Sequence, residues 1–345
     1  MNEEYLDKKN IYLPKKMLED LQQDADRFEA FRKNGKRNMN SFITSLLNGY
    51  YAQYNEERKT QSDLIKAMLQ SKIKDAYDLR NTTTLLLETL SPQTRSYPES
   101  KSMPHLSYKP TRSTKKYFDD IEQRLKDGTA ASLSQYLRDL FASYLSQPIY
   151  KRERIIFSET ISFLEEACTT NSTIRLSSTS EPGKTFDVVC YHLAHSTEEM
   201  FNYLLCQGYN ERMGKVTPFN MRISRIRDPR YTEESLALQP EIKHLLDLMI
   251  EKAPQFTIFK DEEACVQLTE GGMKTYSRIY VDRPKYERLE EQPDKKVNLY
   301  FRNSEEQLNY YFRRFAANEA VVLYPESLAD KIKTFHEESW KAYCK

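Results

Sequence analysis

The chain has 345 residues, of which 39% are hydrophobic and 30% are charged, so it is long enough to bury two or three cores. No apolar run approaches the roughly 20 residues that a membrane-spanning helix needs, which excludes a membrane protein. The first ten residues are polar and do not resemble a signal peptide. The five cysteines are scattered without a metal-binding spacing, which suits a reducing compartment, and we expect a cytoplasmic protein.

Charge is unevenly distributed, although the net charge is only +1. Residues 1–157 contain 27 Lys and Arg against 21 Asp and Glu, a net charge of +6, which favours an anionic partner. The glycines form no GxGxxG, GxxxxGK[ST] or GxSxG pattern, and no local pair of a nucleophile and a base stands out. We therefore expect a protein that is not an enzyme and that needs no cofactor or metal.

A pattern of charged and apolar residues occurs twice in the first half of the chain. KKMLEDL at Lys15–Leu21 recurs as KKYFDDI at Lys115–Ile121, and MNSFITSLL at Met39–Leu47 recurs as LSQYLRDLF at Leu133–Phe141. Each copy predicts a short extended segment, a helix, a loop with a glycine, and a second helix. The apolar residues of the second helices recur at helical spacing, which predicts that the two helices pack against each other.

The extended segment of the first copy alternates apolar Ile11 and Leu13 with polar Asn10 and Tyr12, as a strand with one buried face does. A single strand needs a partner for its backbone groups, either from the other copy or from another chain. This layout resembles the ribbon-helix-helix fold, with copies at 8–54 and 108–147. In that family two strands form a ribbon that lies on nucleic acid.

The resemblance implies which strand residues point outward and contact the nucleic acid. By their register with Pro14 they are Lys8, Asn10, Tyr12, Tyr108, Pro110 and Arg112. Pro110 removes a backbone donor from the second strand, which disfavours sequence-specific reading of a duplex. A helical pairing module with ordinary solvated charges is the alternative interpretation. Between the copies, residues 56–90 are expected to be mostly helical, and the proline-containing stretch 91–110 is expected to be a linker.

After a predicted helix at 155–168, the middle of the chain has short runs with strand-like composition. These runs are Thr173–Ser177, Phe186–His192, Met200–Gln207 and Asn220–Arg227. They predict a small, strongly bent antiparallel sheet or barrel. The region resembles the WYL domain, an SH3-like barrel, through NYLL at Asn202–Leu205 and FNMRISRI at 219–226.

The WYL resemblance implies a site for nucleic acid or a small anionic ligand. The candidate residues, carried over by position, are Tyr191, His192, Tyr203, Arg222 and Arg225. On a strand, Arg222 and Arg225 face opposite sides, and a guanidinium beside Tyr203 suits phosphate binding and base stacking. The alternative is that these are surface arginines paired with local acids such as Asp228.

The tail is predicted to be mixed helix and strand. Helices are expected at 233–252, 305–316 and 325–342, and strands at 255–259, 265–269, 274–282, 296–302 and 321–324. The last strand and helix resemble the extension that follows WYL domains and helps dimers form. We thus expect an α+β chain with a ribbon-helix-helix-like domain at 1–150, a WYL β barrel at 151–232 and an α+β dimerisation domain at 233–345.

Two functional hypotheses remain, and both are binding functions. The combination of ribbon-helix-helix units, WYL domain and extension resembles the accessory proteins of type VI-D CRISPR systems. That resemblance implies a homodimer that binds single-stranded RNA and enhances RNA cleavage by the RNA-guided effector. The alternative is a transcription regulator in which the ribbon binds DNA and the barrel senses a ligand.

Overall fold

The computed structural model describes residues 7–91, 96–98, 102–126 and 132–344. The chain divides into two compact units, Met1–Ile161 and Ser162–Lys345, and each is described by itself. Both contain helices and antiparallel strands, so the chain is of the α+β class that the sequence predicts. The finer division into domains at residues 150 and 232 stays a prediction. The loop glycine of the second copy, Gly128, lies outside the described residues.

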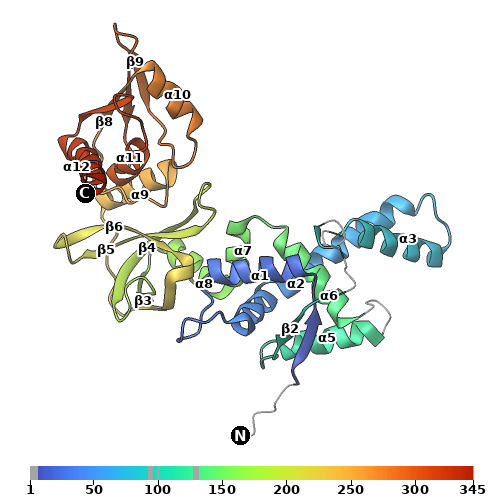
Figure 1. Cartoon of the computed structure of the whole chain (residues 1–345). Helices are drawn as coiled ribbons and strands as arrows, with labels where there is room; N and C mark the ends of the chain where they lie inside the picture. Colours follow the sequence, from blue (N-terminus) through green and yellow to red (C-terminus); the bar gives the residue numbers. More distant parts are fainter. Residues whose placement is uncertain (1–6, 92–95, 99–101, 127–131, 345) are drawn as a thin grey trace. The chain divides into compact units, whose positions relative to one another are not determined.

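The N-terminal unit combines a two-stranded ribbon with helices. Its strands are β1 (Lys9–Tyr12) and β2 (His105–Tyr108), which pair antiparallel. Its helices are α1 (Lys15–Arg27), α2 (Met39–Leu69), α3 (Ala76–Thr89), α5 (Lys115–Lys126), α6 (Leu133–Leu145) and α7 (Ile149–Ile156). The ribbon therefore forms within one chain, because each repeated segment supplies one strand (Figure 1).

The core of this unit forms where the helices of the two copies meet the inner face of the ribbon. Ile11 of β1 and Leu106 of β2 are paired in register and both buried. Leu46, Leu47 and Tyr50 of α2 are at most 1% exposed, and so are the matching apolar residues of α6. The helical spacing of these apolar residues thus corresponds to a buried stripe, as the sequence predicts.

Beyond Tyr54, α2 continues and pairs with α3 as a helical arm that extends from the rest of the unit (Figure 1). The arm leaves large apolar side chains in solvent, with Leu64 60% and Met68 77% exposed. Helices were predicted across 56–90, whereas the predicted linker at 91–110 is wrong in part, because it contains β2. The apolar alternation of β2 covers four residues beside Pro104 and was hidden by the flanking prolines.

In the C-terminal unit the first sheet has five antiparallel strands in the order β6-β5-β4-β3-β7. Their bounds are Thr173–Ser178 (β3), Thr185–His195 (β4), Asn202–Asn210 (β5), Lys215–Arg222 (β6) and Ile226–Tyr231 (β7). The helix α8 (Ser158–Thr169) precedes them, and the 3-10 helix η1 (Ile223–Arg225) joins β6 to β7.

This five-stranded sheet is strongly curled. β6 and β7 are its two edge strands, and in a flat sheet they would lie about 19 Å apart, since neighbouring strands are about 4.8 Å apart. The chain from Arg222 to Ile226 reaches at most about 14 Å. The sheet must therefore bend, but among the fully described residues 162–344 β6 and β7 do not pair. The closed barrel predicted from the sequence is thus replaced by an open, curled sheet.

The second sheet of this unit has the order β11-β8-β10-β9 and is antiparallel. Its strands are β8 (Ala264–Leu268), β9 (Arg288–Glu291), β10 (Val297–Phe301) and β11 (Ala320–Tyr324). The helices are α9 (Pro240–Lys252), α10 (Glu270–Arg278), α11 (Glu305–Phe312) and α12 (Glu326–Tyr343). Leu299, Phe301, Leu308 and Tyr311 are at the centre of its core. In the described part of the chain, no helix is both long and apolar enough to span a membrane.

Three strand predictions in this unit are wrong. The predicted strand Asn220–Arg227 is divided by η1, so Arg225 lies in a turn and not on a strand. Residues 274–282 begin inside helix α10, whose first turn is capped by the Thr269 hydroxyl, which accepts from the Gly272 backbone at 3.2 Å. Residues 255–259 form no strand.

Candidate nucleic-acid interface

The outer face of the ribbon carries two cross-strand pairs of polar and aromatic side chains. Asn10 lies opposite Ser107, and Tyr12 lies opposite His105. The Ser107 hydroxyl donates to the Asn10 side-chain oxygen at 2.9 Å. The rings of Tyr12 and His105 have centroids 6.0 Å apart and are tilted by 54°, and Tyr12 is 49% exposed. This face therefore presents an aromatic pair beside a polar pair.

Reciprocal contacts between the two copies hold the ribbon. The Tyr12 amide donates to the Ser134 hydroxyl at 3.2 Å, and the Tyr12 carbonyl accepts from Arg138 at 3.1 Å. In the opposite direction, the Lys109 amide donates to the Asn40 side-chain oxygen at 2.7 Å. Asn40 and Ser134 occupy matching positions of the repeat, so each second helix anchors the strand end of the other copy. This exchange fixes the ribbon on its helices and gives its outer face a defined shape.

The outward residues of the first copy lie where the register placed them, whereas those of the second copy do not. Asn10 and Tyr12 are exposed on β1, and Lys8 is exposed immediately before it. Tyr108 is fully buried: its hydroxyl bonds to Thr44 at 3.0 Å and its ring stacks on Phe118.

Pro110 and Arg112 also depart from the predicted register. Pro110 is buried after the strand, and Arg112 is exposed in the following turn. The physical reason is the connection length, because two residues separate β1 from α1 while six residues, 109–114, separate β2 from α5. Alignment on the helices therefore placed the second strand four residues too late. The outward residues are His105 and Ser107, and the alternation in HLSY was the signal that identifies them.

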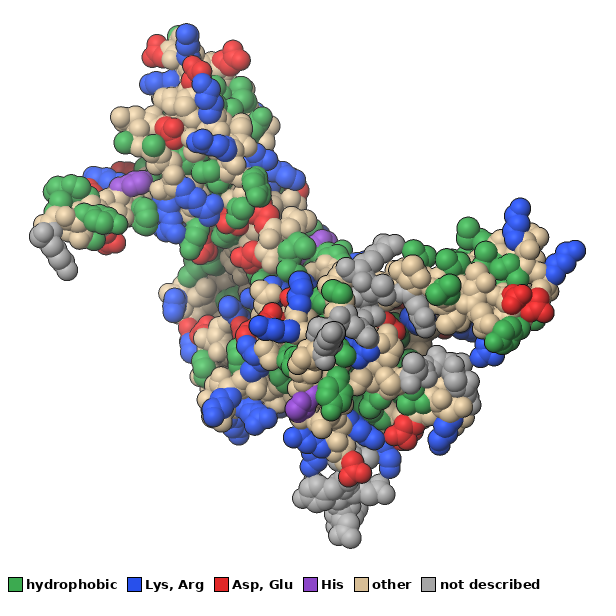
Figure 2. All heavy atoms as spheres, turned by 45° about the vertical axis from the view of Figure 1, so that its right-hand side comes forward, with side chains coloured by type: hydrophobic (Ala, Val, Ile, Leu, Met, Phe, Trp, Pro, Cys, Tyr) green, Lys and Arg blue, Asp and Glu red, His purple; other side chains and the backbone are tan. Residues whose placement is uncertain are grey.

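Several cations surround the ribbon. Lys8 and Arg112 are exposed, and neither makes an ion pair with another described residue. Lys9 instead pairs with Glu122 of α5 at 3.3 Å. Figure 2 shows Lys and Arg side chains at the lower end of the N-terminal unit, the end at which β1 begins in Figure 1. Such cations can neutralise backbone phosphates of a nucleic acid that lies on the ribbon.

In the curled sheet, the predicted stacking residue is covered. Tyr203 is 8% exposed and packs with Leu246 and Met249 of α9, and its hydroxyl donates to Glu199. Tyr203 is the cross-strand partner of Arg222, whose guanidinium lies 3.2 Å from the centroid of the Phe201 ring. The structure therefore brings Tyr203 and Arg222 together as predicted neighbours, but the Tyr203 ring has no free face on which a base could stack.

The other three predicted residues of the sheet are dispersed. The Tyr191 hydroxyl donates to Asp247 of α9, and Lys243 lies 5.5 Å from the Tyr191 ring centroid. Burial and this bond to a carboxylate raise the pKa of Tyr191. His192 and Arg225 are exposed, on β4 and η1 respectively. These residues do not form the single mouth that the sequence predicted, because α9 covers this face of the sheet.

The described residues form an α+β protein with a strand ribbon inside one chain, and the outer face of that ribbon is exposed. No family model matches the chain, and no curated protein matches it. The chain is similar in structure to a protein solved as "Crystal structure of a CRISPR Cas-related protein". The two share a TM-score of 0.68 and 19% sequence identity over 98% of this chain and 94% of that chain. The same fold therefore extends over nearly the whole of both chains.

A second solved structure has much lower similarity. The proteasome accessory factor B/C (PafBC) of Arthrobacter aurescens matches with a TM-score of 0.26 and 14% identity, over 76% of this chain and 36% of that chain. A similarity at this level does not support an argument about fold or function.

Proposed function

We propose that this chain is a non-catalytic accessory protein of a type VI-D CRISPR system, which binds single-stranded RNA and enhances the RNA-guided effector. The observation that carries the proposal is the exposed outer face of the intrachain ribbon. The proposal is also supported by the similarity in fold between nearly the whole chain and a CRISPR Cas-related protein. The assignment to type VI-D rests on the sequence resemblance.

The ribbon face favours a single strand over a duplex. Tyr12 is half exposed beside His105, and unstacked bases can stack on such rings at about 1 to 3 kcal/mol each. The polar pair that would read base edges in a groove is bonded to itself, because Ser107 donates to Asn10. In the WYL-like sheet, His192 and Arg225 remain candidate RNA contacts because both are exposed, whereas Tyr203 is not.

A competition experiment tests the proposal against a transcription regulator. A labelled single-stranded RNA bound to the full chain is competed with unlabelled RNA and with duplex DNA at several salt concentrations. We expect RNA to compete better at every salt concentration, with an affinity that falls as salt rises because counterions are released. Tighter binding of duplex DNA would instead support the regulator.

Replacing Tyr12 by alanine should weaken RNA binding by about 1 to 3 kcal/mol, since one stacking ring is lost from the exposed face. Fluorescence anisotropy with the same labelled RNA measures the effect. Tyr77→Ala is the matched control, because Tyr77 is 71% exposed on the arm of the same unit and lies outside the ribbon. Equal RNA affinities of Tyr12→Ala and Tyr77→Ala would show that the ribbon is not part of the RNA-binding surface.

The effector part of the proposal has its own readout. Adding the full chain to a guide-loaded type VI-D effector should raise the rate of target RNA cleavage, and Tyr12→Ala should reduce that enhancement. A rate that does not respond to the chain would contradict the accessory role even if RNA binds. The proposed homodimer is checked by light scattering; the half-exposed Val321 and Leu323 of edge strand β11 and the exposed Trp340 of α12 offer apolar surface for it.

A further inference from the structure

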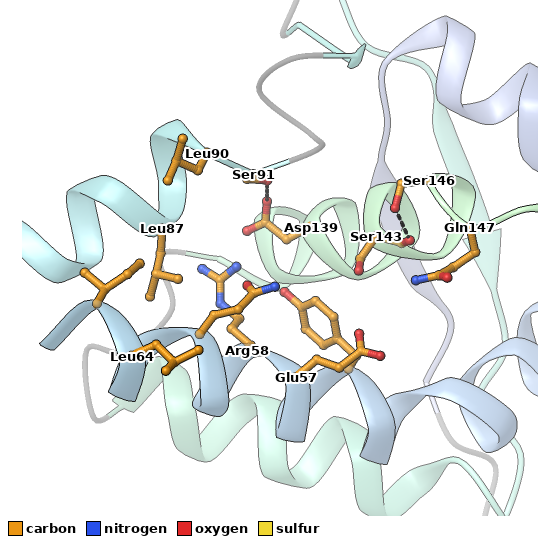
Figure 3. Close-up of a pocket in the computed structure, with 13 residues that line it drawn as sticks. Glu57, Arg58, Leu64, Leu87, Leu90, Ser91, Asp139, Ser143, Ser146 and Gln147 are labelled. Atoms are coloured by element: carbon orange, nitrogen blue, oxygen red, sulfur yellow. Dashed lines mark hydrogen bonds between the residues drawn. The ribbon is translucent and has the colours of Figure 1, made fainter. Parts of the chain in front are cut away.

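A pocket lies on the N-terminal unit where α2, the end of α3 and α6 meet (Figure 3). Its volume is about 440 Å³, within the range typical of small-ligand sites. The ribbon and this pocket share α6, since Arg138 bonds to the Tyr12 carbonyl and the next residue, Asp139, lines the pocket. The ribbon and the pocket use different faces of this helix, since Ser134 and Arg138 contact β1 whereas Asp139, one residue further on, lines the pocket.

The pocket has an apolar side and a polar side. Leu64, Leu87 and Leu90 from the arm lie on one side in Figure 3, and Leu64 and Leu90 are 60% and 52% exposed. Arg58 and Asp139 lie toward the other side. Apolar side chains that flank a few convergent polar groups are suited to a flat ring with a polar edge.

The Tyr54 hydroxyl is a second indication that the pocket binds a ligand. Tyr54 is 4% exposed and lines the pocket, and its hydroxyl makes no hydrogen bond of normal geometry with another described residue, although the Arg58 guanidinium lies nearby. Burial raises the pKa of Tyr54, and the nearby Arg58 guanidinium opposes that effect. A buried polar group without a partner destabilises the fold, so a ligand atom that bonds this hydroxyl would stabilise it.

The charged side chains that line the pocket favour a neutral ring over a phosphate as its ligand. Among the described lining residues, Arg58 is the cation and Glu57 and Asp139 are the anions. A phosphate placed beside two carboxylates would be repelled, whereas a neutral base would not. Asp139 already accepts weakly from Ser91 at 3.3 Å and from Gln135 at 3.4 Å, and burial raises its pKa.

We propose that this pocket takes one unstacked keto base, uracil or guanine, of the RNA strand that the chain binds. The inference rests on the proposed function and deepens it. Uracil and guanine present a carbonyl oxygen next to a ring N–H, so Arg58 donates to the carbonyl while Asp139 accepts from the N–H. In the same orientation cytosine presents the reverse pattern, an amino donor next to an acceptor nitrogen, so its amino group would face the donor Arg58 and its ring nitrogen the acceptor Asp139.

The experiment compares oligouridine with oligocytidine of equal length, because the two bases have the same size and differ at the edge that the pocket would read. The full chain should bind oligouridine about 5- to 100-fold more tightly. Arg58→Gln should abolish that preference while oligocytidine affinity stays close to the wild-type value. Lys59→Gln is the matched control, since Lys59 is the exposed neighbour on α2 and does not line the pocket.

Three results would overturn the inference. Equal affinities for the two oligomers in the wild type, or an equal loss of both in Arg58→Gln, would show that the pocket reads no base, and the proposed RNA binding would stand. Binding of neither oligomer would overturn the proposed function as well.

A second variant keeps the test independent of folding. Tyr54→Phe removes the unpartnered hydroxyl and retains the ring, so the melting temperature should not fall. Oligouridine affinity should fall severalfold, because the ligand loses one hydrogen bond. Unchanged oligouridine affinity in Tyr54→Phe would also overturn the assignment.

Discussion

Replacing Asp24 by alanine is expected to lower the free energy of unfolding by about 3 to 5 kcal/mol, because it breaks a buried ion-pair network. Asp24 on α1 is completely buried. Its carboxylate accepts from Arg27 at 2.5 Å, from Arg152 of α7 at 2.5 Å and from the Tyr144 hydroxyl of α6 at 3.1 Å. Without it, two guanidinium groups whose side chains are only 22% and 13% exposed lose their counter-charge.

Asp26→Ala is the matched control for Asp24→Ala. Asp26 lies two residues later on the same helix and also pairs with an arginine, Arg37, but its side chain is 43% exposed. An exposed pair contributes about 1 kcal/mol or less, so this control should unfold at almost the wild-type denaturant concentration. Urea unfolding measures both variants. Equal losses would show that burial does not set the strength of the Asp24 network.

The contributions of Asp24 and Asp26 to the free energy of unfolding should change in opposite directions with pH. Burial raises the pKa of Asp24 above its ordinary value near 3.8, although Arg152 and Arg27 oppose the shift. Between the two pKa values the folded chain keeps a proton on Asp24 that the unfolded chain has released. The contribution of Asp24 to the free energy of unfolding therefore falls as pH rises through the raised pKa. The hydrogen bond from Arg37 lowers the pKa of Asp26, so its contribution is lost as pH falls below 3.8. Unfolding of Asp24→Asn and Asp26→Asn across this range should show opposite trends.

The sequence was most informative where one strand or helix could be recognised from its own residues. The alternation around Ile11 and the helical stripes of the repeat identify β1 and the paired helices, because side-chain burial there follows local periodicity. The pairing register between segments that lie far apart in the sequence was harder to predict. β2 was displaced because a connection of six residues replaces one of two, and helix alignment alone does not reveal that difference.

Composition was misleading where tertiary contacts decide the structure. Residues 274–282 are rich in β-formers, yet residues 274–278 belong to α10, which begins at Glu270 and includes Gly271 and Gly272. A side chain at Gly272 would lie 2.1 Å from the Glu319 carbonyl oxygen, so this glycine permits close packing that a local pattern does not show. Similarly, the burial of Tyr203 depends on α9, which begins more than thirty residues later in the chain.

The candidate site also combines residues that local sequence identifies with residues that only the tertiary structure identifies. Lys8, Asn10 and Tyr12 follow from the alternation of one strand, whereas His105 and Ser107 depend on the pairing register. The pocket of Arg58 and Asp139 could not be predicted, because the two residues lie on different helices and no local spacing connects them. Local chemistry therefore identifies the ribbon, and only the assembled helices reveal the pocket.

Replacing Gly49 by alanine is expected to destabilise the N-terminal unit by about 3 kcal/mol, as overpacking at a rigid contact does. Gly49 lies in α2 where this helix contacts α7. An added Cβ would lie 2.0 Å from the Ile155 carbonyl oxygen and 2.9 Å from its carbon. Both atoms belong to the backbone, so no change of side-chain rotamer relieves the contact, and the two helices must move apart.

Gly35→Ala distinguishes this packing effect from the general cost of replacing a glycine. Gly35 has φ of +74° and no atom within 4 Å of an added Cβ, so its cost of about 1 to 2 kcal/mol comes from backbone strain alone. Gly49 has no such strain, and its larger loss should come from displaced helices. Thermal unfolding followed by circular dichroism ranks the two variants. A Gly49→Ala protein as stable as the wild type would show that the backbones of α2 and α7 do not approach each other this closely.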